Sequence, residues 1–276
     1  MIEIPDPQNR DLTKFFPDSP SNFLATSILE GHMGQVLADD AQRPNVVVLT
    51  LPNIKYNILG GDAGHPAARE YLEKLPRLSP LFFGAPGWKE LFISVHANKL
   101  VVRKRYAFSS QSLDPAHLRL LRAKLAPEFT TRRIDLPLAQ QIAAHKEEIT
   151  KEQLFGFKSA EDFMQRGIGY AAFDGNRMVC IAAAGSACSK GIEIQINTNS
   201  KYQGRGLASA VGAELILWCL ENGIDPNWDA ATEISAGLAR KLGYTSLGAY
   251  DAYHYVGSKF LVTLINAFRR LRGKEI

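Results

Sequence analysis

The chain is poor in cysteine and has no long hydrophobic run, and each scarcity excludes a class of protein. It has three cysteines among 276 residues, with no Cys-x-x-Cys spacing, so we expect a reducing compartment and no metal site. No run approaches the roughly 20 apolar residues that a membrane-spanning helix needs. The N-terminus, Met1 to Asp6, is acidic and lacks the positively charged start of a signal peptide. We therefore expect a cytoplasmic protein with no membrane span.

The chain also has nearly as many acidic as basic residues. The formal net charge is +4 and the sequence pI is ≈ 8.9, and a basic pI alone does not imply nucleic acid. We expect no nucleic-acid partner. Hydrophobic residues make up 46% of the chain, which at this length is enough for a substantial core and for one or two domains of about 100–200 residues.

The first 128 residues have the patterns of a mixed α/β domain. The stretch 1–45 is only weakly periodic, whereas Val46 to Leu51 is a β-branched run that predicts a buried strand. Asp114 and Pro115 are typical of a helix start, because Asp caps and Pro suits the first turn. The other predictions are a loop over 57–66, a helix over 66–75, strands over 91–95 and 100–108, and a helix from 114 to 126.

The second half is more regular in pattern. Ser159 and Asp162 are spaced as in a capping box, and Asp174-Gly175-Asn176 is typical of a hairpin turn. Gly223 and Gly243 stand where two helices would end. The patterns predict strands over 130–134, 168–173, 178–184, 191–198, 227–230 and 244–255, and helices over 137–148, 206–221, 233–242 and 257–276.

The most informative segment is the Gly-rich stretch Tyr202-Gln203-Gly204-Arg205-Gly206-Leu207-Ala208. It follows the alternating strand 191–198 and opens a helix, so the free N–H groups of the first helical turn face it. With the partial positive charge of the helix dipole, such a turn is a site for a phosphate. Gln203 and Arg205 add side-chain donors. Taken alone, glycines here are also ordinary features of a tight turn.

A second block of sequence makes the phosphate-site interpretation of the Gly-rich segment more specific. It runs from Pro226-Asn227-Trp228-Asp229-Ala230 to Lys241-Leu242-Gly243-Tyr244. In this order the two blocks resemble the GNAT N-acetyltransferases, whose pyrophosphate-binding turn has the pattern Gln/Arg-x-x-Gly-x-Gly/Ala. The resemblance covers roughly residues 130–256. It looks closest to a two-part branch with an N-terminal extension that includes zwittermicin-resistance acetyltransferases.

The resemblance implies a mixed α/β fold, with a splayed sheet flanked by helices and a smaller mixed α/β domain before it. It implies acetyl-CoA as co-substrate, with the pantetheine arm paired like an extra strand to the strand before the turn. By position, the backbone of Ile196, Asn197 and Thr198 would face pantetheine, and Thr232 would donate to one of its carbonyls. The pyrophosphate would lie against Gln203, Gly204, Arg205, Gly206, Leu207 and Ala208.

The family's chemistry implies direct transfer of acetyl to a primary amine, on a small molecule or a protein, in a ternary complex. A carboxylate or imidazole must take the amine's proton. Glu193 and Asp229 are the candidates, with a solvent-facing strand residue and a helix cap as their plain alternatives. Where many members have a Tyr that protonates the leaving thiolate, this chain has Ala239. The replacements Tyr244, Tyr250, Tyr253 and His254 stay open, and Tyr253 represents them in the catalytic set.

We expect three parts: an N-terminal domain over 1–128, an acyltransferase domain over 129–256 and an amphipathic, basic helix over 257–276. That helix either docks on the domain or meets an acidic partner such as anionic lipid or RNA. A non-catalytic acyl-CoA-binding or interaction module is the alternative function, and Ala239 is the residue that favours it.

Overall fold

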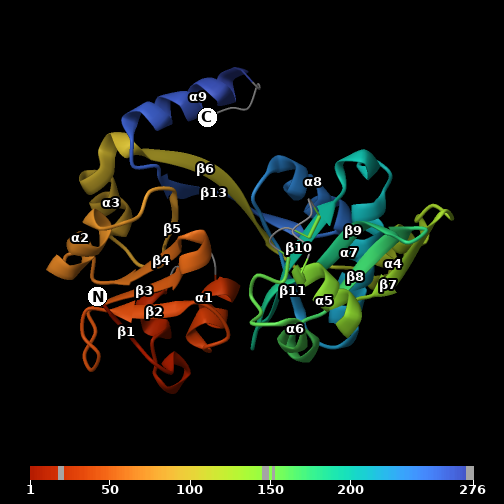
Figure 1. The fold of residues 1–276 in the computed structure, drawn as a ribbon, viewed down its shortest axis with the longest axis horizontal. Coiled ribbons are helices and arrows are strands. Elements are labelled where there is room, and N and C mark those ends of the chain that lie inside the picture. The colour runs from red at the N-terminus through yellow and green to blue at the C-terminus, as the bar shows by residue number, and fades with distance from the viewer. Residues whose placement is uncertain (18–21, 145–148, 151–152, 272–276) are drawn as a thin grey trace. The chain divides into compact units, whose positions relative to one another are not determined.

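The computed structural model describes residues 1–17, 22–144, 149–150 and 153–271. The chain forms two compact units, which are described separately (Figure 1). Unit 1 comprises Met1–Arg105 and Ala249–Ile276, and unit 2 is the continuous segment Tyr106–Gly248. The chain crosses from unit 1 to unit 2 within β6 (Leu100–Ser109) and returns within β13 (Thr245–Tyr255). These units differ in extent from the domains expected over 1–128 and 129–256.

Unit 1 is built on a mixed sheet with helices on it. The strands follow the order β1-β2-β3-β4-β5-β13-β6, and β4 with β5 is a parallel pair. Their bounds are β1 Ile2–Glu3, β2 Gln35–Ala38, β3 Val46–Leu51, β4 Tyr56–Gly61 and β5 Ser79–Phe83. The helices are α1 Asn22–Leu29, α2 Pro66–Glu73, α3 Trp88–His96 and α9 Lys259–Leu271.

The apolar run of β3 is explained by cores on both faces of this sheet. Val47 and Leu49 join the core that contains Ile28 of α1. Val46 and Val48 join a second core with Trp88 of α3. Because successive strand residues point to opposite faces, a strand covered on both faces is apolar at most positions, and only Thr50 interrupts the apolar run of β3.

Two predictions in this unit are wrong. Residues 56–61 form β4, although their glycines predicted a loop. Gly60 is a strand glycine because the ring of Phe16 lies where its Cβ would be, and glycine in a strand often marks such an approach. Residues 91–95 belong to the helix α3. Its buried residues Trp88, Phe92 and His96 are spaced four apart, which is the period of one helix face.

Unit 2 contains the sheet β11-β10-β9-β8-β7, in which only the β10–β11 pair is parallel among the described strands. The strands are β7 Phe129–Arg133, β8 Gly169–Asp174, β9 Arg177–Cys188, β10 Gly191–Thr198 and β11 Asp225–Asn227. The helices are α4 Pro115–Ala123, α5 Leu136–Ala144, α6 Ala160–Arg166, α7 Leu207–Glu221 and α8 Glu233–Leu242. The mixed α/β fold expected from the sequence is confirmed.

Several local predictions in unit 2 are confirmed by their hydrogen bonds. Ser159 caps α6 by accepting from the N–H of Asp162 at 3.2 Å, and Asp114 caps α4. Strand 191–198 and helix 233–242 have the predicted bounds. The helix predicted over 137–148 is α5, and residues 145–148 lie outside the described ones. In the part of the chain that the structure describes, no helix is long and apolar enough to cross a membrane.

Candidate functional site

Strand β10 is paired along its length on one side and for only its first part on the other. On the β9 side the register runs from Gly191 to Thr198, with a bulge between Glu193 and Ile194. On the β11 side, the described register joins Gly191–Glu193 to Asp225–Asn227 and ends there. Ile194–Thr198 are partly exposed. The backbone edge of this segment is therefore placed to accept another extended chain.

The cause of the opening lies at Trp228, where the chain changes sheet. After β11 it continues as β12 (Asp229–Ala230), which pairs with Tyr106 and Ala107 of β6 instead of β10. The Trp228 ring is buried, and its Nε1–H donates to Ser235 Oγ at 3.2 Å. This buried anchor fixes the point at which the two neighbouring strands part.

The Gly-rich turn follows β10 after Asn199 and the short 3-10 turn Ser200–Tyr202. Gly204 and Gly206 have φ values of 78° and 81°, which L side chains rarely adopt. At both positions no described heavy atom lies within 4 Å of where a Cβ would stand. Gly206 is the N-cap of the 15-residue helix α7, so the N–H groups of the first turn have no side-chain cap there. This is an open, positively polarised cradle of the kind that fits a pyrophosphate.

Arg205 is held beside this cradle by aromatic and acidic neighbours. Its guanidinium carbon lies 5.0 Å from the ring centroid of Phe129 and 5.6 Å from that of Tyr202. Its Nη2 lies 3.6 Å from Glu128 Oε1. Tyr202 is itself fixed, because its hydroxyl donates to Asp174 Oδ2 at 2.9 Å. Arg205 is thus engaged by these neighbours, while Gly204 and Gly206 stay exposed.

The two faces of β10 have different chemistry. Ile196 points to α7, where its Cδ1 lies 2.9 Å from the Cβ position of Gly212. On the other face, Glu193 Oε2 accepts from Asn227 Nδ2, and Asn197 Nδ2 donates to the Ile149 carbonyl at 3.2 Å. Glu193 is therefore oriented by the last residue of β11, at the point where the strands part.

The polar face holds groups that the sequence did not single out. Gln195 Oε1 and Ser186 Oγ are buried and have no hydrogen-bond partner among the described residues. The backbone at Phe155 and Gly156 crosses this face, since Gly156 N–H donates to the Gly185 carbonyl at 2.8 Å. No sequence motif marks these residues, because they meet only through the β9–β10 register and the segment over it.

The remaining predicted residues are scattered. Asp229 pairs with Ala107 across the β12–β6 ladder. It is not the cap of α8, because Thr232 has that role and accepts from the Ser235 N–H at 3.2 Å. Ala239 is buried in the core around Trp228. Tyr253 belongs to unit 1 and is 5% exposed, with its ring centroid 5.2 Å from that of Phe83.

Tyr244 has a structural hydrogen bond in place of a free hydroxyl. The phenol donates to the Pro226 carbonyl at 2.6 Å, and burial raises its pKa well above the usual value. Of the residues proposed to replace the missing Tyr, this one is engaged in holding β11.

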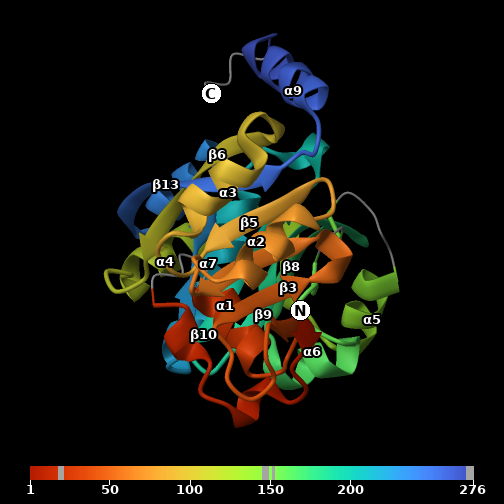
Figure 2. The same ribbon diagram turned by 90° about the vertical axis from the view of Figure 1, so that its left-hand side faces the viewer.

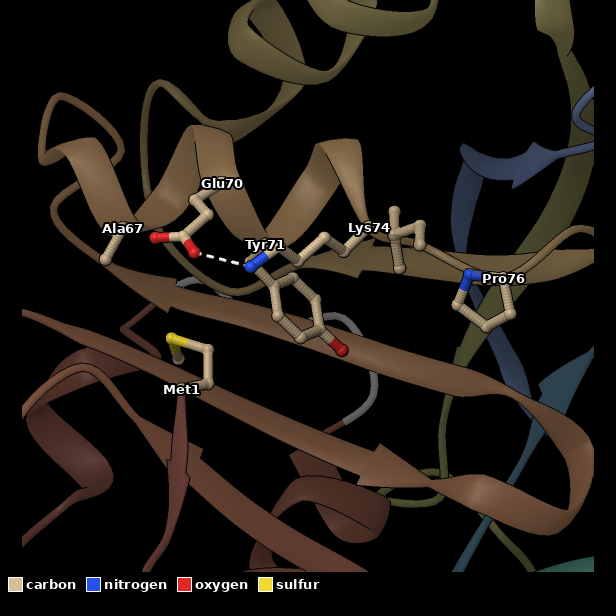
Figure 3. Close-up of a pocket in the computed structure, with 7 residues that line it drawn as sticks. Met1, Ala67, Glu70, Tyr71, Lys74 and Pro76 are labelled. Atoms are coloured by element: carbon tan, nitrogen blue, oxygen red, sulfur yellow. Dashed lines mark hydrogen bonds and ion pairs between the residues drawn. The ribbon is translucent and has the colours of Figure 1, made fainter.

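A surface cavity of about 320 Å³ lies in unit 1, against α2 (Figure 3). Its polar groups pair with one another or with the sheet: Lys74 Nζ binds Glu70 Oε1 at 2.5 Å, and the Tyr71 hydroxyl donates to Asn57 Oδ1 at 2.6 Å. It contains none of the predicted site residues, and we assign it no role. Its lining residues are Met1, Ala67, Glu70, Tyr71, Lys74, Leu75 and Pro76.

A strand edge left open where two neighbours part, followed by a glycine cradle at a helix start, is typical of acyl-CoA-dependent transferases. Comparison with known proteins places the chain in the same class. A family model described as GNAT acetyltransferase matches residues 14–253. The chain belongs to this family and is an acyltransferase. The match extends into the N-terminal region, beyond the 130–256 segment in which the sequence motifs lie.

Individual relatives agree with the family match. An uncharacterized N-acetyltransferase of Bacillus subtilis (strain 168), YdfB, is 27% identical over 262 residues, which cover 91% of this chain and 97% of that protein. A GCN5-related N-acetyltransferase-like protein from Streptococcus suis 89/1591 has a crystal structure that is 30% identical, with a TM-score of 0.76, and covers 91% of this chain and 98% of its own. A GCN5-related N-acetyltransferase from Kribbella flavida shares the fold at 12% identity, with a TM-score of 0.57 and coverage of 85% and 95%.

Proposed function

We propose that the protein is an N-acetyltransferase that moves acetyl from acetyl-CoA directly to a primary amine in a ternary complex. Membership of the GNAT acetyltransferase family supports transfer of an acetyl group. The observation that carries the site is the continuity of the open β10 edge with the glycine cradle of Gly204 and Gly206. One extended ligand can pair with the strand edge and end with its phosphates at the α7 N-terminus.

In this proposal the co-substrate lies along the residues that the family resemblance implies. The backbone of Ile196, Asn197 and Thr198 pairs with the pantetheine arm, since this segment is the partly exposed end of β10 that lies beyond its pairing with β11. Thr232 retains a hydroxyl proton to donate, because only its oxygen is used in capping α8. The pyrophosphate lies on Gln203, Gly204, Arg205, Gly206, Leu207 and Ala208.

Glu193 is the proposed proton acceptor for the attacking amine. Its hydrogen bond from Asn227 fixes the carboxylate at the parting of the strands, where an acyl group paired with β10 would end. Asp229, one residue beyond Trp228, is the second proposed carboxylate. Tyr253 remains the proposed proton donor to the thiolate, although its ring packs against Phe83 and Phe92 in the unit 1 core.

The acceptor is proposed to carry a primary amine on a small molecule, as in the zwittermicin-resistance-type branch, or on a protein. The polar face with Gln195 and Ser186 supports an acceptor with hydrogen-bonding groups, because a bound ligand would satisfy these buried atoms. An assay of the enzyme with acetyl-CoA and a panel of amines, in which release of the CoA thiol is measured, tests which acceptors are acetylated. Binding of acetyl-CoA without turnover of any amine would support the alternative of a non-catalytic acyl-CoA-binding module.

The cradle can be tested with a matched pair of glycines. Gly206 and Gly223 flank α7, have φ values of 81° and 67°, and both have open space at the Cβ position. Gly206→Asp places a negative charge in the cradle and should weaken acetyl-CoA binding on the order of 100-fold by calorimetric titration. Gly223→Asp imposes a similar backbone demand and should leave the affinity unchanged. Equal affinities of the two variants would overturn the placement of the pyrophosphate.

A further inference from the structure

The C-terminal helix α9 (Lys259–Leu271) is amphipathic but lacks the buried face of the other helices in unit 1. Phe260 is 69% exposed and Leu264 is 39% exposed. Of residues 259–267, whose exposure is described, none is buried, whereas α1, α2 and α3 each bury several side chains. In both views α9 extends beyond the sheet of unit 1 (Figures 1 and 2). Its described packing is against the turn Ala97–Lys99.

The net charge of the chain is concentrated in residues 259–276, which comprise α9 and the residues 272–276 that the structure does not describe. Residues 259–276 hold five of the 32 Lys and Arg and one of the 28 Asp and Glu. Residues 1–258 therefore contain 27 of each sign and are formally neutral, and the whole net charge of +4 belongs to the last 18 residues. The basic residues are Lys259, Arg269, Arg270, Arg272 and Lys274.

The surface at the start of α9 repeats this combination of cations and exposed apolar groups. The Lys99 carbonyl accepts from Val256 N–H at 2.8 Å, and Gly257 packs directly against the side chain of Arg77. Lys55 Nζ donates to the Arg77 carbonyl at 3.2 Å. Beside Arg77, Leu78 is 60% exposed. The side chains of Lys55, Arg77 and Lys99 are exposed.

We propose that α9 and this basic rim bind the surface of an anionic lipid membrane, with Phe260 and Leu264 inserted among the lipids. An interfacial helix has a large apolar face, a cationic polar face and too little hydrophobicity to span, and anionic headgroups attract the cations. This combination favours lipid over RNA, because phosphates alone would leave the apolar stripe in water. It goes beyond the proposed acetyl transfer and does not depend on it.

A second copy of the chain fits the face less well. A 13-residue helix is about 20 Å long and presents a face of roughly 200 Å², against the roughly 800 Å² per partner of a stable interface. Two copies would also bring like-charged segments together. A lipid surface has no such minimum area, since the apolar residues insert one by one.

The test is co-sedimentation of the full-length protein with vesicles of phosphatidylcholine, alone or mixed with phosphatidylglycerol. We expect binding to the mixed vesicles, weakened by salt, and little binding to the neutral ones. Phe260→Ser with Leu264→Ser should lower the partition coefficient by about tenfold or more, since each buried apolar side chain contributes to insertion. Leu120→Ser, at a 64% exposed apolar position of α4, is the matched control and should bind as the wild type does.

A second pair tests the charge. Arg269→Glu with Arg270→Glu should abolish binding to the anionic vesicles, whereas Arg122→Glu with Lys124→Glu, at the end of α4, should not. A circular-dichroism melting curve like that of the wild type confirms that each variant is folded. Absent binding of the wild type, equal binding to neutral vesicles, or no effect of the Phe260 and Leu264 substitutions would overturn the proposal. The proposal would also be overturned if the protein formed a dimer, or bound RNA, and the same apolar substitutions abolished that association.

Discussion

Glu193 and Asn227 form the smallest arrangement whose role can be tested. We expect Glu193→Gln to lower kcat by about 10²–10⁴-fold, as for loss of a general base, and to leave acetyl-CoA affinity unchanged because the strand edge is intact. Asn227→Ala should give a smaller loss, since it frees the carboxylate without removing it. Glu221→Gln, at an exposed position at the end of α7, is the control. A wild-type kcat in Glu193→Gln would exclude it as the base.

The cysteines give a prediction with a pH dependence. Burial raises the pKa of Cys180 to about 11 and that of Cys219 to about 12. The folded state thus holds protons that the unfolded thiols lose from about pH 9. The contribution to stability is complete below that pH and is lost as the pH rises through the folded pKa values. We expect the melting temperature to fall between pH 9 and 11, and Cys180→Ala to reduce the slope.

At the scale of one element, Thr232 can be separated into two roles. Its oxygen caps α8, and its proton is proposed to meet pantetheine. Thr232→Asp keeps an acceptor and should leave the free energy of unfolding unchanged or higher, whereas Thr232→Ala should cost about 1 kcal/mol. If the hydroxyl donates to the co-substrate, both variants should bind acetyl-CoA several-fold more weakly. If Thr232→Asp bound acetyl-CoA as tightly as the wild type, capping α8 would be the sole role of Thr232.

Elements whose signals are local were predictable from the sequence. Alternation of apolar and polar residues predicts strand 191–198, and glycines predict the turn at Gly204 and Gly206. Capping residues within a few positions predict helix 233–242. The errors at 56–61 and 91–95 came from tertiary causes: Phe16 packs on a strand glycine, and Trp88 and Phe92 bury a helix face. The parting of β10 and β11 was expected only from the family resemblance. No local pattern shows that β12 pairs with β6.

At the scale of the whole molecule, unit 2 is one continuous segment and unit 1 is not. We expect the fragment 106–248 to fold and to bind acetyl-CoA within about tenfold of the full chain, because β10, the glycine turn and α8 all lie in it. Circular dichroism and calorimetric titration measure both. A folded fragment without binding would show that unit 1 supplies part of the co-substrate site.

Fragments of unit 1 should behave differently. Residues 1–105 alone lack β13, which lies between β5 and β6 in the sheet, so we expect them not to fold. Lys104 Nζ lies 2.7 Å from Asp251 Oδ1, which places the two breaks close together. Joining Arg105 to Ala249 through a short Gly-Ser linker should therefore give a folded unit 1. Cooperative unfolding of residues 1–105 by themselves would contradict this.

The central position of β13 also bears on the order in which a ribosome releases the chain. The strands β1 to β6 emerge first, but the strand that joins β5 to β6 is made only after all of unit 2. During synthesis the edges of β5 and β6 that face β13 therefore stay unpaired, while the later segment can already close its own core. Exposed edges invite pairing between chains. The early part of this protein should thus be the more dependent on chaperones, and slowed translation beyond residue 105 should increase aggregation.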